Sequence, residues 1–68
     1  MIPTGTRIRF VKTLDAPANE DHPYIVYAYA GEEGVVTGHG CPEGYWVRTL
    51  TWSAPFGASE KEFEVLSP

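Results

Sequence analysis

The feature that most constrains the fold is the segment GEEGVVTGHG at residues 31–40, which holds four of the seven glycines. Its first four residues suit a tight reversal in which glycine takes a positive φ, and Val35, Val36 and Thr37 suit a short strand. A phosphate-binding glycine loop needs a helix directly after it, whereas here residues 38–44 form a second loop before another strand. The segment therefore predicts a turn and a central strand of a β-domain.

Two longer segments also have strand character. Residues 6–14 alternate, with Ile8, Phe10 and Leu14 on the apolar side. Residues 45–52 alternate as well, but either face could be buried, because both carry large apolar groups. The sequence leaves the buried face of this strand open.

Shorter strands are expected at residues 24–30, which are aromatic and β-branched, and at residues 63–66. Residues 15–23 contain two prolines and three acids, which predicts a long loop, either a solvated connector or a functional loop. Residues 53–59 are expected to be a connection. A single helical or 3₁₀ turn is expected at residues 60–62, with Ser59 as its cap.

A chain of 68 residues predicts a single domain, 1–68, with a core that must be dense in large side chains. Five short strands in so small a chain would leave flat sheets with unpaired edges and little core. The expected fold is therefore all-β, a strongly bent five-stranded barrel.

The order of these elements resembles the SH3-like barrel superfold. The resemblance rests on the segment GTRIRF at residues 5–10, GEEGVV at 31–36, YWVR at 45–48 and EFEVL at 62–66. Within that superfold it is similar to the group that contains the small stromal subunit of photosystem I, the variable chain of ferredoxin–thioredoxin reductase and the nitrile hydratase β-chain barrel. KOW-type nucleic-acid modules share the G-x-x-G-x-V pattern of Gly31, Gly34 and Val36. These barrels host unrelated activities, so the resemblance implies a fold and no single function.

A second resemblance concerns residues 42–45 and Val47, which are similar to a segment of the plasmid-borne trimethoprim-resistant dihydrofolate reductase. That family lines its active pore with a Val-Gln-Ile-Tyr stretch on a following strand. Residues 46–68 contain no such stretch, so reductase activity is not implied.

The charge is unevenly distributed along the chain. Residues 1–14 carry +3, residues 15–43 carry −6 and the remainder carries −1, for a net charge of −4. An acidic domain is a poor match for phosphate, so nucleic-acid binding requires a local patch made by Arg7, Arg9, Lys12 and Arg48. It is kept as the alternative function.

Catalytic and metal chemistry find little support. His22, His39 and Cys41 are too few for a structural zinc site, and no third group orients His39 and Cys41 for nucleophilic catalysis. We therefore expect no metal, no cofactor and no enzyme activity from a monomer, while a homo-oligomeric enzyme with its site at a symmetry axis is the second alternative. One cysteine and no apolar span predict a cytoplasmic protein without membrane contact.

The aromatic residues give the main hypothesis, because a core this small cannot enclose all nine rings. Peptide-binding SH3 domains use an aromatic groove flanked by an acidic loop. We expect a small interaction module or accessory subunit that binds a protein partner, or itself, while the reading that most rings belong to the core stays open. The candidate binding residues are Tyr24, Tyr27, Tyr29, Tyr45, Trp46, Trp52, Asp15, Glu20 and Asp21.

Overall fold

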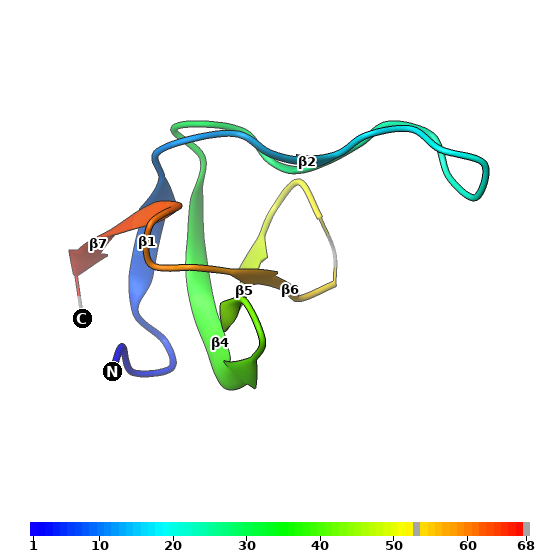
Figure 1. Ribbon diagram of the computed structural model, residues 1–68. Coiled ribbons are helices and arrows are strands. Elements are labelled where there is room, and N and C mark those ends of the chain that lie inside the picture. The colour runs from blue at the N-terminus through cyan, green and yellow to red at the C-terminus, as the bar shows by residue number, and fades with distance from the viewer. Residues whose placement is uncertain (53, 68) are drawn as a thin grey trace.

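A computed structural model describes residues 1–52 and 54–67; Ser53, within the expected connection, and Pro68 lie outside the described residues. The described residues form strands and no helix, which confirms the all-β prediction (Figure 1). The strands are β1 (Arg7–Phe10), β2 (Leu14–Ala16), β3 (Ile25–Ala28), β4 (Glu33–Cys41), β5 (Gly44–Thr49), β6 (Phe56–Ala58) and β7 (Phe63–Ser67).

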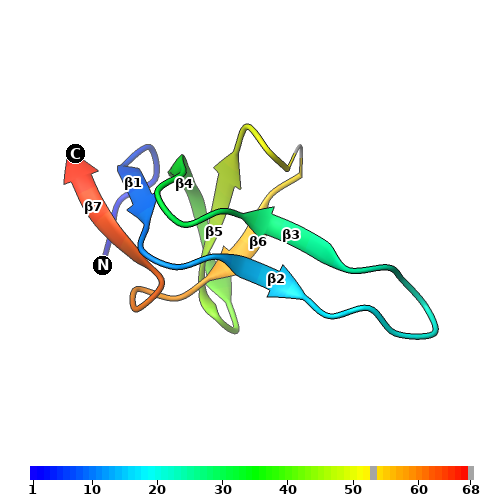
Figure 2. The ribbon, with the colours of Figure 1, turned by 90° about the horizontal axis from the view of Figure 1, so that it is seen from above.

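The strands form two antiparallel sheets. The main sheet has five strands in the order β6-β5-β4-β1-β7, and β2 pairs with β3 in a separate hairpin, which we call the arm. The arm extends away from the main sheet and crosses above β6 (Figures 1 and 2). The main sheet has the expected number of strands, but neither sheet closes into a barrel, so β6 and β7 remain edges.

The arm changes two expectations. Residues 15–23 were expected to be a loop, yet Asp15 and Ala16 pair with Val26 and Ile25. The expected strand at residues 24–30 therefore belongs to the arm, and the place it would have had in the main sheet is taken by β6, inside the expected connection. Pairing between β2 and β3 supplies backbone hydrogen bonds that a proline-rich sequence alone does not reveal.

Strand β4 runs further than the sequence suggests. Residues 38–44 were expected to be a loop, but β4 continues to Cys41, with register shifts between Val36 and Gly38 and between His39 and Cys41. Such shifts are bulges, which a glycine accommodates; Gly40 has a φ of 88°. The glycines thus bend a continuous strand instead of ending it.

The core lies on one face of the main sheet. Ile8 and Phe10 of β1 are buried, and on β5 the buried side carries Tyr45, Val47 and Thr49, which settles the face that the sequence left open. Aromatic contacts run in a chain through this core, from Trp52, which follows β5, to His39 of β4. The rings in contact order are Trp52, Tyr27, Phe56, Phe10, Phe63, Tyr45 and His39.

The N-terminal segment is tied to this core at Ile2. Its amide donates a hydrogen bond to the Tyr45 hydroxyl over 3.1 Å, and its carbonyl accepts one from Nε2 of His39 over 2.6 Å. The Tyr45 hydroxyl donates in turn to Glu60 over 2.9 Å. Tyr45 and His39, for which the sequence allowed a binding or catalytic role, therefore have structural contacts.

The single turn expected before β7, with Ser59 as its cap, is present as one isolated hydrogen-bonded turn. The Glu62 amide donates to the Ser59 carbonyl, the Ser59 amide donates to Oε1 of Glu62, and the Lys61 amide donates to the Ser59 hydroxyl. These are the contacts of a capping box, but β7 begins at Phe63, too soon for a helix.

Candidate binding groove

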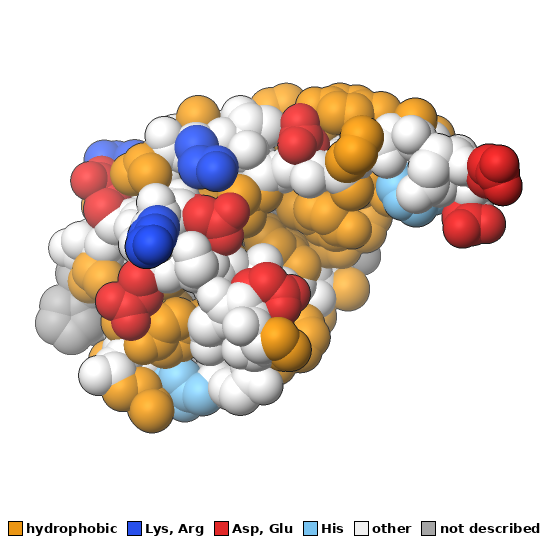
Figure 3. All heavy atoms as spheres, in the orientation of Figure 1, with side chains coloured by type: hydrophobic (Ala, Val, Ile, Leu, Met, Phe, Trp, Pro, Cys, Tyr) orange, Lys and Arg blue, Asp and Glu red, His pale blue; other side chains and the backbone are white. Residues whose placement is uncertain are grey.

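A groove with a volume of about 520 Å³ lies below the arm, along edge strand β6. Figure 3 shows hydrophobic side chains lining a hollow below the arm. The lining residues share two properties: most are apolar or aromatic, and the charged ones are all acidic. They are Leu14, Asp15, Tyr27, Glu43, Trp46, Trp52, Pro55, Phe56, Gly57 and Glu62.

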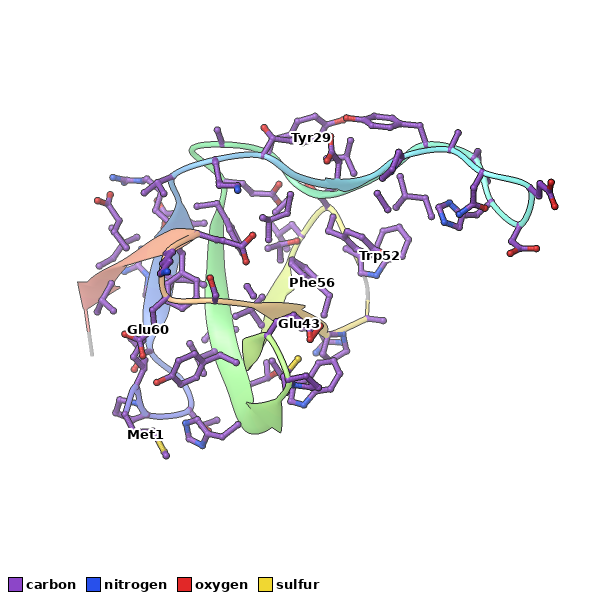
Figure 4. The ribbon with its side chains drawn as sticks, in the orientation of Figure 1. Met1, Tyr29, Glu43, Trp52, Phe56 and Glu60 are labelled. Atoms are coloured by element: carbon purple, nitrogen blue, oxygen red, sulfur yellow. The ribbon has the colours of Figure 1, made fainter. Side chains whose placement is uncertain are left out.

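The aromatic wall of the groove is anchored in the core. The Tyr27 ring lies 5.1 Å from the Trp52 ring at 71° and 5.4 Å from the Phe56 ring, measured between ring centroids. Phe56 is buried and also contacts Phe10, whereas Tyr27 and Trp52 are only partly buried. Side chains that pack on a core at one edge and meet solvent at the other form a pre-ordered apolar surface (Figure 4).

Trp46 and Glu43 form the other wall. Trp46 projects from β5 on the side away from the core and is 39% exposed. It pairs in register with Gly57 of β6, whose missing side chain leaves space: a Cβ there would lie 3.0 Å from a Glu43 oxygen and would collide with Sγ of Cys41. Glycine at position 57 therefore lets Glu43 and Cys41 lie against the backbone of β6.

The acids of the groove are held by local hydrogen bonds. Asp15 accepts a hydrogen bond of 2.6 Å from the Tyr24 hydroxyl, and this bond is the main reason that the pKa of Tyr24 is raised. Glu62 accepts from the Ser59 amide, and Glu43 accepts from the thiol of Cys41 over 3.6 Å. No ion pair between described residues involves any of these three carboxylates. The groove therefore presents negative charge beside aromatic rings.

The structure brings together four of the residues proposed from the sequence: Asp15, Tyr27, Trp46 and Trp52 line the groove. Tyr24 and Tyr29 are exposed on the arm, outside the lining. Glu20 and Asp21 lie at the exposed tip of the arm, where the Asp21 amide donates a hydrogen bond to Oδ1 of Asn19. Tyr45 is only 7% exposed and belongs to the core.

Sequence reasoning missed the contributions of Glu43, Phe56 and Glu62. Glu43 and Glu62 each belong to a short turn, and nothing in the local sequence shows that the two turns face the same hollow. Phe56 lies within residues 53–59, which were expected to be a connection. An apolar residue next to proline and glycine is a weak strand signal, so only pairing with β5 shows where it lies.

The surface of β1, β4 and β7 on the side away from the core, which we call the outer face, has a different character. There Arg7 and Arg9 pair with Glu33 over 2.9 Å and 3.6 Å, and Arg9 also pairs with Glu64 over 3.5 Å. The hydrogen bond from Arg7 is the main cause of the lowered pKa of Glu33. Lys12, the third base of the N-terminal region, is exposed beyond β1. The bases proposed as a nucleic-acid patch thus include two whose charge is already balanced.

Among residues 1–52 and 54–67, no group of three or more metal-ligating side chains gathers at one point. The described strands and turns include no helix long and apolar enough to cross a membrane. No protein-family model, curated protein or solved structure matches this chain. The groove itself is therefore the basis for a functional proposal.

Proposed function

We propose that this chain is a non-catalytic interaction module that binds a segment of a protein partner in the groove along β6. The observation that carries the proposal is the set of partly exposed aromatic side chains on both walls of the groove: Tyr27 packs on the buried Phe56, and Trp52 packs on Tyr27. Trp46 lines the other wall. Tyrosine and tryptophan that are rigid before binding supply large contact areas at a small entropic cost, and they dominate many protein interfaces. The volume of the groove suits several side chains of a bound segment.

The alternatives from the sequence gain no comparable support. A nucleic-acid site on the outer face would have to displace Glu33 from Arg7 and Arg9 before those bases met phosphate. A site at a symmetry axis requires an oligomer, which sedimentation would reveal.

A peptide-selection experiment tests the proposal. Random peptides displayed on phage are selected on the immobilised full chain, and the recovered peptides are titrated by calorimetry against wild type, Trp46→Ala and Leu50→Ala. Trp46 lines the groove, whereas Leu50 is a fully exposed apolar residue outside it, which makes it a matched control. Binding should weaken about tenfold or more in Trp46→Ala and remain unchanged in Leu50→Ala.

Two results would count against the module. Either no peptide is recovered, or the recovered peptides bind Trp46→Ala as tightly as wild type. A thermal melt of each variant shows that the fold is retained, since both altered side chains lie outside the core.

A further inference from the structure

Strand β6 has a free edge. Its residues pair with β5, Phe56 opposite Val47, Gly57 opposite Trp46 and Ala58 opposite Tyr45, and the sheet ends there. Among the described residues, no backbone hydrogen bond joins β6 to a strand other than β5. An edge strand offers its outward N–H and C=O groups to any chain that lies beside it.

The groove lies at this free edge. Phe56 and Gly57 of β6 line it together with Pro55, which precedes the strand, and Leu14 and Asp15 line it from β2 of the arm. The other edge strand of the main sheet, β7, contributes no residue to the lining of this groove. Of the two open edges, β6 is therefore the one that lines the groove, with side-chain partners on both of its faces.

Alternate residues of β6 direct a neighbouring strand to two different environments. Phe56 faces Tyr27 on the core side, whereas Gly57 lies beside Trp46 and Glu43 on the opposite side. Successive side chains of a strand point to opposite faces. A strand added to β6 would accordingly place one side chain on the aromatic wall and the next against Trp46.

Charge identifies the chemistry of the added strand. The groove lining contains Asp15, Glu43 and Glu62 and no lysine or arginine, in a chain whose net charge is −4. A cation over the face of an indole is attracted by the ring, and a neighbouring carboxylate adds to that attraction. A second copy of this acidic chain matches the groove poorly, since Arg7 and Arg9 already pair with Glu33.

We propose that the groove binds an extended, cationic segment of a partner protein, an inference that rests on the proposed binding function. The segment adds to β6 as a further strand, antiparallel or parallel. It places a lysine or arginine side chain against Trp46, beside Glu43. Strand addition supplies main-chain hydrogen bonds, and the two side-chain environments supply selectivity. The glycine at position 57 lets Glu43 lie against the backbone of β6, on the side of the strand where Trp46 lies, so a cationic side chain placed there meets the carboxylate.

The first test concerns charge and uses the peptides selected on the full chain. We expect lysine and arginine to be enriched, and we expect affinity to fall about three- to tenfold in Glu43→Gln. Glu20→Gln is the matched control, because it removes the same charge at the tip of the arm, outside the groove; it should change affinity less than about twofold. Selected peptides that need Trp46 but are neutral or acidic, or that bind both glutamine variants equally, overturn this inference and leave the proposed module standing.

The second test concerns the backbone. Each amide of the best peptide is N-methylated in turn and titrated against the full chain. An added strand uses every second amide toward its neighbour, so losses of about tenfold or more should alternate with tolerated positions. Proline-rich peptides that tolerate methylation throughout would indicate a polyproline helix instead, and a dimer in sedimentation that excludes the peptide would assign β6 to a second copy. Either result overturns strand addition by a partner.

Discussion

The outer face and the groove both carry several carboxylates, but they balance them differently. On the outer face Glu33 lies between Arg7 and Arg9, so each charge has an opposite charge within 4 Å. In the groove Glu43 accepts a hydrogen bond from the Cys41 thiol and Glu62 accepts one from the Ser59 amide; both donors are uncharged. Ion pairs balance the charges of the outer face, whereas the carboxylates of the groove form no ion pair with another described residue.

This difference between the outer face and the groove indicates where the excess negative charge of the chain lies. Three of its five basic residues are arginines, and two of these are occupied on β1. The acids at the tip of the arm and in the groove therefore dominate the field on that side (Figure 3). Such a field accelerates association with cationic partners and weakens as salt is added.

The largest expected effect is on the free energy of unfolding, and it compares a groove residue that packs in the core with an exposed residue outside the groove. Phe56 forms part of the groove and also contacts Phe10, so Phe56→Ala should destabilise the fold by about 3–5 kcal/mol. Leu50→Ala, at a fully exposed site, should change stability by less than about 0.5 kcal/mol. Urea denaturation measures both.

A domain this small has a stability of only about 3–5 kcal/mol, so Phe56→Ala could leave too little folded protein to measure. Phe56→Leu keeps most of the volume and should fall between wild type and alanine. Equal midpoints for the Phe56 and Leu50 variants would contradict the idea that the floor of the groove belongs to the core.

The second prediction compares two glycines of β4. A Cβ at Gly34 would lie 2.7 Å from the Arg48 carbonyl oxygen, so Gly34→Ala must push β5 away from β4 and should cost about 1–3 kcal/mol. A Cβ at Gly38 would lie 3.7 Å from the nearest Trp46 atom, an ordinary contact. Gly38→Ala should be neutral or stabilise by up to about 1 kcal/mol, because it restricts the unfolded chain. Similar urea midpoints for the two variants would refute the close approach at Gly34.

The third prediction concerns Glu32, which joins the base of the arm to the end of β5. Burial alone would raise the pKa of Glu32, but hydrogen bonds from Thr51, Tyr29 and Thr49 together outweigh it and hold the pKa below the ordinary value of 4.5. A lowered folded-state pKa stabilises the fold above about pH 4.5, and that contribution disappears as the pH falls through the folded-state value.

Glu32→Gln should therefore reduce stability at pH 7 and flatten the loss between about pH 6 and pH 3. Thermal melts across this range measure it, with Glu20→Gln as the control at an exposed site. A wild-type-like slope in Glu32→Gln would show that another carboxylate carries the acid sensitivity.

The smallest expected effect concerns the outer face alone. Glu33→Gln removes the charge that Arg7 and Arg9 share, so it should lower stability slightly at low salt. In about 1 M NaCl, where the screening length is roughly 3 Å, the difference from wild type should vanish. A difference that persists at high salt would mean that Glu33 acts through packing rather than charge.

Patterns of alternation predicted the parts of the fold that bury one face. Ile8 and Phe10 of β1 are buried as the period of two requires, and the all-β composition was evident. The strand expected at residues 6–14 was too long, because β1 ends at Phe10 and Leu14 begins β2 of the arm. The sequence did not predict β6, because three residues next to a proline carry too little pattern. It also did not reveal that β2 and β3 leave the main sheet, since pairing partners depend on contacts distant in the chain.

The candidate site, like the fold, was predicted where residue type is sufficient and missed where strand pairing decides. Residue type alone selected Trp46, Trp52, Tyr27 and Asp15, since a core this small cannot enclose all nine rings and an acidic loop was expected beside the exposed ones. Residue type also selected Tyr45, whose ring is enclosed because it falls on the buried side of β5. Only the register of β5 against β4 and β6 separates Tyr45 from Trp46, its neighbour in the sequence.

The groove has one practical consequence that follows from where the indole rings lie. The chain has two tryptophans, and both line the groove. All of the intrinsic tryptophan fluorescence thus originates at the candidate site, with no indole elsewhere to dilute the signal. A bound segment should exclude water and shift the emission to shorter wavelengths, whereas unfolding should shift it to longer ones. The unlabelled protein is therefore its own optical reporter, and the direction of the shift distinguishes occupancy from loss of structure.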